Sequence, residues 1–262
     1  RRFPLEAGVS PQFTELDDRA ARLLREQIVE EMADRLAPDV MAEVALAYTG
    51  DDFTSLMEQV AGRRANFTDG SDAALGIPDG ESASLIVGSV IIGGEAAWKA
   101  TVHTGLAGGS RTDSRAFHTL SGLDLASPTL QTLATLEGVL LTGASAKAPY
   151  SAKIGSFPTK DSRALLSSVL PHLDALMLRV EAARARRLLF QAAIKTLTLQ
   201  RFARAFLPIY ASRKAARGWL DFDDLITRAK ALLSDPAVAA WVLFRLDGGI
   251  DLVLVDERSE EH

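Results

Sequence analysis

Apolar residues recur every three or four positions over much of the chain, which predicts a mainly helical protein. The first such segment, "LDDRAARLLREQIVEEMADRLA", has apolar positions from Ala20 to Met32, and Asp17 or Asp18 can cap it. Two further segments, "PDVMAEVALAYT" and "DDFTSLMEQVAGRRANF", begin with Pro or Asp and end near Gly or polar residues. Together these segments predict an antiparallel helical start.

The segment "SLIVGSVIIGG" is rich in β-branched residues, and its local propensity favours a strand. Its neighbours "GEAAWKATVHTGLA" and "SPTLQTLATLEGVLLTG" have helical spacing instead. Because a lone hairpin among helices would leave an unpaired edge, we expect helix rather than a hairpin over residues 84–93.

Residues 143–161 concentrate Gly, Pro, Ser and Lys without periodicity, which predicts an ordered loop or a linker. A second helical block runs from about Ser162 to about Arg217, where Pro208 either begins a new helix or kinks the old one. After it we expect two short helices and a strand near residues 250–255, with another short strand near residues 13–16.

Composition limits the class of protein. With 262 residues and 47% hydrophobic content, the chain can form one large or two modest domains. A net charge of -5 argues against coating nucleic acid by bulk charge, although a local basic face stays possible. The absence of cysteine excludes disulfides, thiol catalysis and Cys-ligated zinc, and fits a reducing cytoplasm.

The first residues, "RRFPLEAGVSPQF", have no apolar core of signal-peptide length, and no later segment offers the roughly 20 uninterrupted apolar residues that a membrane helix needs. We therefore expect a cytoplasmic protein that does not contact a membrane. Its first residues, "RRFPLEAG", include no methionine and no obvious helix cap, so we expect the chain to begin inside a longer protein.

One basic segment stands out in this acidic chain. Between Arg179 and Arg217 there are ten Lys or Arg residues and one acid, Glu181. Such a segment can contact DNA phosphates, or it can be a solvated or internally paired face beside the acidic N-terminal helices. An aromatic stripe within it is more typical of a core than of a base-stacking platform: Phe202, Phe206 and Tyr210.

Two groups of carboxylates are candidates for chemistry. In "LDFDDLI", Asp221 can cap a helix whose first turn holds Asp223 and Asp224, or the three can hold a divalent ion. The capping interpretation fits better, because the apolar residues of this segment have the spacing of an ordinary amphipathic helix: Phe222, Leu225 and Ile226. The scattered histidines form no recognisable catalytic motif: His103, His118 and His172.

The second group is Asp256 and Glu257, which follow a nearly continuous apolar run. Nucleotide-hydrolysing folds hold a metal ion and a catalytic carboxylate at this end of a buried strand. A core strand that simply meets solvent is the alternative. No Gly-Lys pair occurs in the chain, so it lacks the loop G-x-x-x-x-G-K-[ST] that cradles phosphates.

Four segments in order, "FPLEAGVSPQFTELDD", "SAKIGSFPTKD", "ARGWLDFDDLI" and "WVLFRLDGGIDLVLVDE", resemble the AddA family over the whole chain. AddA proteins are helicase-nuclease subunits of bacterial double-strand-break repair, in the UvrD/Rep class of superfamily 1 helicases. The resemblance implies that residues 1–16 flank the first RecA-like domain, residues 17–217 form the helical accessory domain 1B, and residues 218–262 return to the RecA-like α/β domain and end at Walker B.

The resemblance also implies a parent protein that is an ATP hydrolase and exonuclease, with ATP and Mg²⁺ as cofactors and with DNA and an AddB-like subunit as partners. In that parent Asp256 would ligate Mg²⁺ through water, and Glu257 would position or deprotonate the attacking water. The P-loop would precede Arg1, and the other helicase motifs and the nuclease would follow His262. The fragment alone is expected to be inactive, without bound cofactor. Candidate DNA contacts are basic residues of the long segment: Arg184, Arg187, Lys195, Arg201 and Arg204.

One departure from the family is clear after Glu257. The family continues D-E-A-Q-D, whereas this chain continues with Arg258, Ser259, Glu260, Glu261 and His262. The Gln that would couple ATP to DNA is absent, which leaves such a site incomplete. The competing interpretation is a non-enzymatic helical module that binds DNA or a protein, in which "LVDE" is an incidental strand end.

Overall fold

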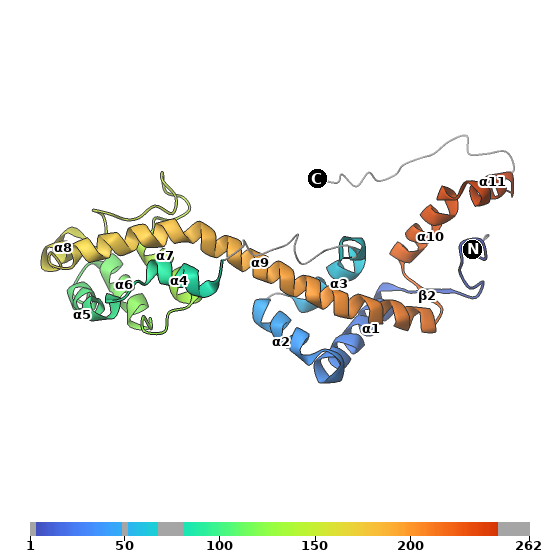
Figure 1. Cartoon of the computed structure of the whole chain (residues 1–262), viewed down its shortest axis with the longest axis horizontal. Helices are drawn as coiled ribbons and strands as arrows, with labels where there is room; N and C mark the ends of the chain where they lie inside the picture. Colours follow the sequence, from blue (N-terminus) through green and yellow to red (C-terminus); the bar gives the residue numbers. More distant parts are fainter. Residues whose placement is uncertain (1–3, 49–51, 68–80, 246–262) are drawn as a thin grey trace. The chain divides into compact units, whose positions relative to one another are not determined.

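The computed structural model describes residues 4–48, 52–67 and 81–245 (Figure 1). The described residues are mainly helical, as the apolar spacing predicts. They belong to two compact units, one built from residues 1–70 and 198–262 and the other from residues 71–197. The sequence predicts boundaries between a RecA-like domain and an accessory domain after residues 16 and 217. These boundaries stay predictions, because the division into two compact units does not identify a RecA-like domain.

In its described residues, the first unit contains two short strands together with N- and C-terminal helices. Its elements are β1 Thr14–Glu15, α1 Asp18–Glu31, the π-helix η1 Met32–Leu36, α2 Pro38–Ala47, α3 Phe53–Gly62, the 3-10 helix η2 Arg64–Phe67, β2 Trp219–Leu220, α10 Phe222–Ser234 and α11 Pro236–Arg245. The helix α9, Leu170–Ala216, contributes its part from Thr198 onward to this unit.

The core of the first unit forms around the aromatic stripe of α9. Phe202 and Phe206 are fully buried, and their rings stack with centroids 5.4 Å apart. Tyr210 stacks on Phe206 at 5.6 Å, and Phe53 of α3 meets Phe202 edge-on at 5.6 Å. The prediction that this stripe is core is confirmed. Apolar residues of α1, η1, α2 and α3 complete the cluster: Leu24, Ile28, Met32, Val44, Met57 and Val60.

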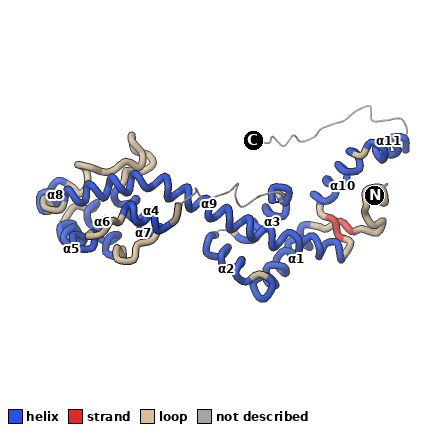
Figure 2. The backbone as a smooth tube through the Cα atoms, in the orientation of Figure 1, coloured by secondary structure: helices blue, strands red, loops and turns tan. Residues whose placement is uncertain are grey.

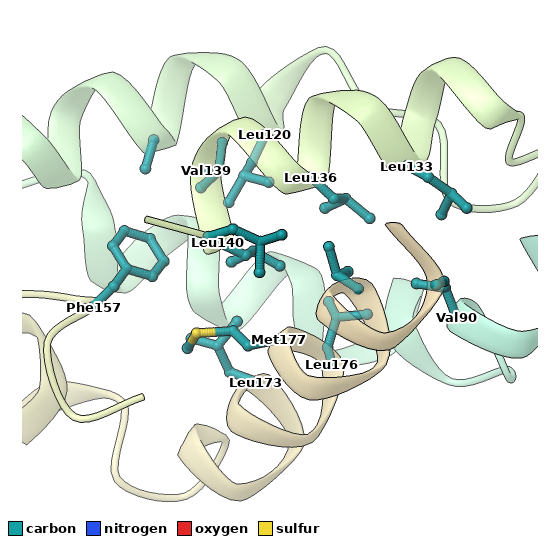
Figure 3. Close-up of a cluster of buried hydrophobic side chains, with 14 of the residues drawn as sticks. Val90, Leu120, Leu133, Leu136, Val139, Leu140, Phe157, Leu173, Leu176 and Met177 are labelled. Atoms are coloured by element: carbon teal, nitrogen blue, oxygen red, sulfur yellow. The ribbon is translucent and has the colours of Figure 1, made fainter. Parts of the chain in front are cut away.

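The second unit consists of short helices packed on the first part of α9. They are α4 Ala83–Val90, α5 Glu95–Leu106, α6 Arg111–Ser121, α7 Leu130–Leu140 and α8 Lys160–Leu165. Figure 3 shows leucines of α7 facing Leu173, Leu176 and Met177 of α9 in its buried core. The expected helix near residues 84–93 is confirmed over residues 83–90, because Ser82 caps α4 and Ile86 and Val90 are buried.

The segment after α7 is an ordered loop of the second unit rather than a linker. A bridge pairs Leu141 with Ala152, and the Thr142 hydroxyl donates to the Ala148 carbonyl at 2.6 Å. Phe157 at the end of the loop is buried in the core (Figure 3). One of the two alternatives from the sequence is thereby confirmed, since buried anchors fix both ends of the segment.

The second helical block is confirmed as α8 followed by α9, which together run from Lys160 to Ala216. Of the two alternatives at Pro208, a new helix is excluded, because Pro208 lies inside α9. A kink there stays a prediction. Proline normally costs a helix one backbone hydrogen bond, but the buried rings of Phe206 and Tyr210 on either side stabilise the continuous helix.

The expected short strand near residues 13–16 is confirmed as β1, and its partner was not predicted. β1 pairs in parallel with β2, with Thr14 opposite Trp219 and Glu15 opposite Leu220 (Figure 2). Gly218 adopts a φ of +64°, which ends α9 and turns the chain into β2. The strand expected at residues 250–255 lies outside the described residues.

Within the described ranges, no single helix is long and apolar enough to cross a membrane. One bent pair, α4 with α5, passes that test by length and composition, with a bend of 58° between its helices.

We predict that Phe202→Ala lowers the free energy of unfolding by about 3–5 kcal/mol, because it removes a fully buried ring and leaves a cavity. Phe222→Ala is the matched control. Phe222 is 71% exposed, so the same change there should shift stability by about 0.5 kcal/mol or less. Urea unfolding followed by circular dichroism measures both. Equal losses in the two variants would contradict the packing described above.

Candidate functional site

A network of four charged side chains, joined by Tyr210, lies where η2, the end of α9 and the start of α10 meet. We call it the ionic cluster, and it consists of Arg64, Tyr210, Lys214, Asp221 and Asp224. All five residues belong to the first unit. The cluster joins segments that lie far apart in the sequence.

Two cations share two carboxylates in the ionic cluster. Arg64 Nη1 lies 3.0 Å from Asp221 Oδ2, and its Nη2 lies 2.9 Å from Asp224 Oδ1. Lys214 Nζ donates to both carboxylates and also lies 4.6 Å from the centre of the Tyr210 ring. Lys214 is only 4% exposed, so its charge is compensated almost entirely by these partners.

The same carboxylates cap α10. Asp221 Oδ1 accepts a hydrogen bond from the Asp224 amide at 2.8 Å, and Asp224 Oδ2 accepts one from the Asp221 amide at 3.1 Å. This reciprocal capping box confirms the capping interpretation of "LDFDDLI". Among the described residues, no group of three or more His, Cys, Asp or Glu is arranged to hold a metal ion.

The apolar residues of "LDFDDLI" behave differently from their prediction. Phe222 and Ile226 are exposed in the described structure, so the expectation that they pack as in an ordinary amphipathic helix is wrong for both. Capping by Asp221 and Asp224 fixes the start of α10 without any buried apolar contact from Phe222.

Electrostatics in the ionic cluster favour fixed charges. Burial raises the pKa of the Asp221 carboxyl, but hydrogen bonds from Arg64 and Lys214 outweigh burial and hold that pKa well below its usual range. Burial, together with the neighbouring charge of Asp221, raises the pKa of the Tyr210 hydroxyl to about 12. General acid-base catalysis needs a pKa near the working pH, and both values move away from neutrality. The arrangement therefore suits a structural joint.

The predicted DNA contacts occupy three kinds of environment. Arg187 is buried and donates to both oxygens of Glu137, at 2.5 and 2.7 Å. Arg184 stacks on Tyr150, with its guanidinium carbon 3.5 Å from the ring centre, and its Nε lies 3.4 Å from Glu137. The remaining three are exposed, and each has an interaction partner: Lys195, Arg201 and Arg204.

Internal pairing is general along α9. Arg201 Nη1 lies 3.0 Å from Glu43, although its side chain is 58% exposed. Three further pairs connect α9 to acids of its own unit: Arg179 with Glu95, Arg186 with Glu81, and Arg213 with Glu31. Of the interpretations of the basic segment, internal pairing is therefore confirmed for these cations. Contact of the exposed cations of α9 with DNA stays a prediction.

Asp256 and Glu257 lie outside the described residues. Sequence reasoning also missed Arg64 and Glu137, whose partners are far away in the chain. The one available signal was an acid at a buried helical position, since Glu137 lies between Leu136 and Val139 in an otherwise apolar stretch. No local pattern connects Arg64 to Asp221.

No family model matches this chain, and neither a curated protein nor a solved structure matches it. The resemblance to AddA proteins therefore depends on the sequence motifs alone.

We predict that Asp221→Asn lowers the free energy of unfolding by about 1–3 kcal/mol at pH 7. This is less than the roughly 3–5 kcal/mol of a fully buried pair, because Asp221 is still partly accessible. The folded-state pKa of Asp221 is depressed, so its stabilisation is present above the unfolded pKa of about 3.9 and is lost as the pH falls through the folded value.

Urea titrations between neutral pH and about pH 3 measure this difference. The gap between wild type and Asp221→Asn should narrow below about pH 4. Asp223→Asn is the matched control, since Asp223 lies in the same helical turn but, in the described structure, forms no ion pair with Arg64 or Lys214. If Asp221→Asn lowers the free energy of unfolding at pH 7 no more than Asp223→Asn does, or if its effect grows in acid, the charge of Asp221 contributes little to stability.

Proposed function

We propose that this chain is the accessory-domain region of an AddA-like, ATP-dependent DNA helicase-nuclease, together with flanking parts of its first RecA-like domain. The supporting observation is the pairing of β1 with β2. It brings the segment "PQFTELDD" beside the segment "GWLDFDDL", although the two are separated by most of the chain. The intervening helices leave and re-enter at one place, which is the topology of an insertion into another domain.

In this proposal the catalytic chemistry belongs to the parent protein. Asp256 and Glu257 supply the Walker B acids, and the parent supplies the loop that holds ATP and Mg²⁺. These two acids lie outside the described residues, so no catalytic step is derived for the described part. The activity proposed is unwinding and degradation of DNA in double-strand-break repair and recombination, beside an AddB-like subunit in the cytoplasm.

The set of residues proposed to contact DNA is smaller than the set of five that the sequence predicts. Arg187 is buried against Glu137, so it contributes to the fold. Lys195, Arg201 and Arg204 are exposed on α9 and are the candidates that DNA can reach. Contacts of this kind go to phosphates and carry no sequence information.

A non-enzymatic helical module is the second candidate. The internal pairing of the α9 arginines favours its protein-binding form, because paired cations release few counterions on binding DNA. The two candidates differ in what the gene encodes before Arg1.

We predict that the reading frame upstream of Arg1 encodes G-x-x-x-x-G-K-[ST], since Walker B acids without phosphate-cradling amides cannot stabilise the transition state. Sequencing the flanking DNA decides this directly. A start codon immediately before Arg1 would remove the motor proposal and leave the helical module.

We also predict weak binding of single-stranded DNA by this chain at low salt, and a smaller salt dependence in the variant Lys195→Gln/Arg201→Gln/Arg204→Gln. Each phosphate contact removed should lower the slope of log K against log salt by about 0.7. Fluorescence anisotropy at several salt concentrations measures the slope.

The matched control is Arg22→Gln, because Arg22 is an exposed arginine of α1 that pairs with Glu26 much as Arg201 pairs with Glu43. Its affinity and slope should equal those of wild type. A triple variant that also equals wild type would assign this part of α9 to structure alone.

A further inference from the structure

A cavity of about 340 Å³ lies in the second unit, between α6, α7 and the ordered loop that follows α7. Its volume is at the lower end of the range of small-molecule sites, about 300–1,000 Å³. One face of α6 lines it with Thr112, Arg115 and Thr119, which recur at three- and four-residue spacing. Gly138 of α7 and Lys153 and Phe157 of the loop contribute to the other walls.

Two cations line this cavity and no carboxylate does. Lys153 Nζ donates to the Val139 carbonyl at 2.7 Å and lies 6.0 Å from the centre of the Phe157 ring. Burial lowers the pKa of Lys153, since nothing negative compensates its ammonium group. In the described structure, neither Lys153 nor Arg115 forms an ion pair, whereas Arg184, Arg186 and Arg187 of the same unit each have a glutamate partner.

The apolar walls of the cavity are fixed by the core. Phe157, Val139 and Ala116 line it and are all buried. Gly138 lies inside α7, where glycine weakens a helix. A Cβ atom placed on Gly138 would meet nothing within 4 Å, so packing does not require glycine there. The missing side chain leaves open space at the cavity wall.

We propose that this cavity binds a small organic oxyanion, a carboxylate or phosphate monoester on a compact apolar body. Arg115 and Lys153 hold the anionic group, and Phe157 and Val139 contact the apolar body. Arg115 is suited to this role because its planar guanidinium can donate two parallel hydrogen bonds to an oxyanion. The threonine hydroxyls of α6 supply further donors. This site is independent of the function proposed above.

The test is a titration of the whole chain with phenyl phosphate and with benzoate, followed by isothermal calorimetry or ligand-observed NMR. Benzyl alcohol supplies the apolar body without the charge, and inorganic phosphate supplies the charge without the body. We expect saturable binding of at least one aryl oxyanion with a Kd in about the millimolar range or tighter. Stronger binding of phenyl phosphate than of benzoate, or the reverse, identifies the anionic group, and either result supports the proposal.

Variants locate the ligand. Arg115→Gln and Lys153→Gln should each weaken binding by about tenfold, since each removes a charge-assisted hydrogen bond. Gly138→Leu should abolish binding by filling the cavity while both cations remain. Arg111→Gln and Lys147→Gln are matched controls, because they remove exposed cations from the same helix and the same loop outside the cavity.

Arg115 is exposed, so its variant should keep the wild-type circular dichroism spectrum even if Gly138→Leu does not fold. No binding of either aryl oxyanion up to about 10 mM would overturn the proposal. Equal binding of benzyl alcohol, equal binding of inorganic phosphate, or unchanged affinity in Arg115→Gln would also overturn it.

Discussion

The carboxylate of Asp221 between Arg64 and Lys214 is the interaction that joins η2 and the end of α9 to the start of α10 in the first unit. It lies where η2, α9 and α10 meet: Arg64 and Lys214 contribute the cations, and Asp221 caps α10. Since Lys214 is almost fully buried, removing its partners would leave an uncompensated charge inside the protein. The cost of that charge makes alternative arrangements of these segments unfavourable.

Charges along α9 follow the same logic. Glu31, Glu95 and Glu137 each receive an arginine from α9, so basic residues that look like a nucleic-acid surface in the sequence mostly hold each unit together. The proposed motor therefore has only a few exposed cations on this helix with which to contact DNA. In the second unit, Arg115 and Lys153 differ from these arginines of α9, because they line a cavity and have no ion-pair partner in the described structure.

Local patterns predicted most of the fold. Apolar spacing gave the helices, Asp221 gave the cap of α10, and the aromatic stripe gave the core. The Arg64–Asp221 pair and the pairing of β1 with β2 could not be predicted, because each depends on a long-range approach that no spacing encodes. Local reasoning left a new helix or a kink open at Pro208, and the structure excludes the new helix, since packing of the neighbouring rings outweighs the lost hydrogen bond. The cavity was missed because Arg115 and Lys153 lie on separate elements.

The most direct test of this account is a double-mutant cycle between Arg64→Met and Asp221→Asn, measured as free energies of unfolding at pH 7. If the ionic cluster holds η2, α9 and α10 together, the sum of the two single-variant losses of stability should exceed the loss in the double variant. The difference, which is the coupling energy, should be about 1–3 kcal/mol. Additive losses, within about 0.3–0.5 kcal/mol, would contradict the central role given to this pair.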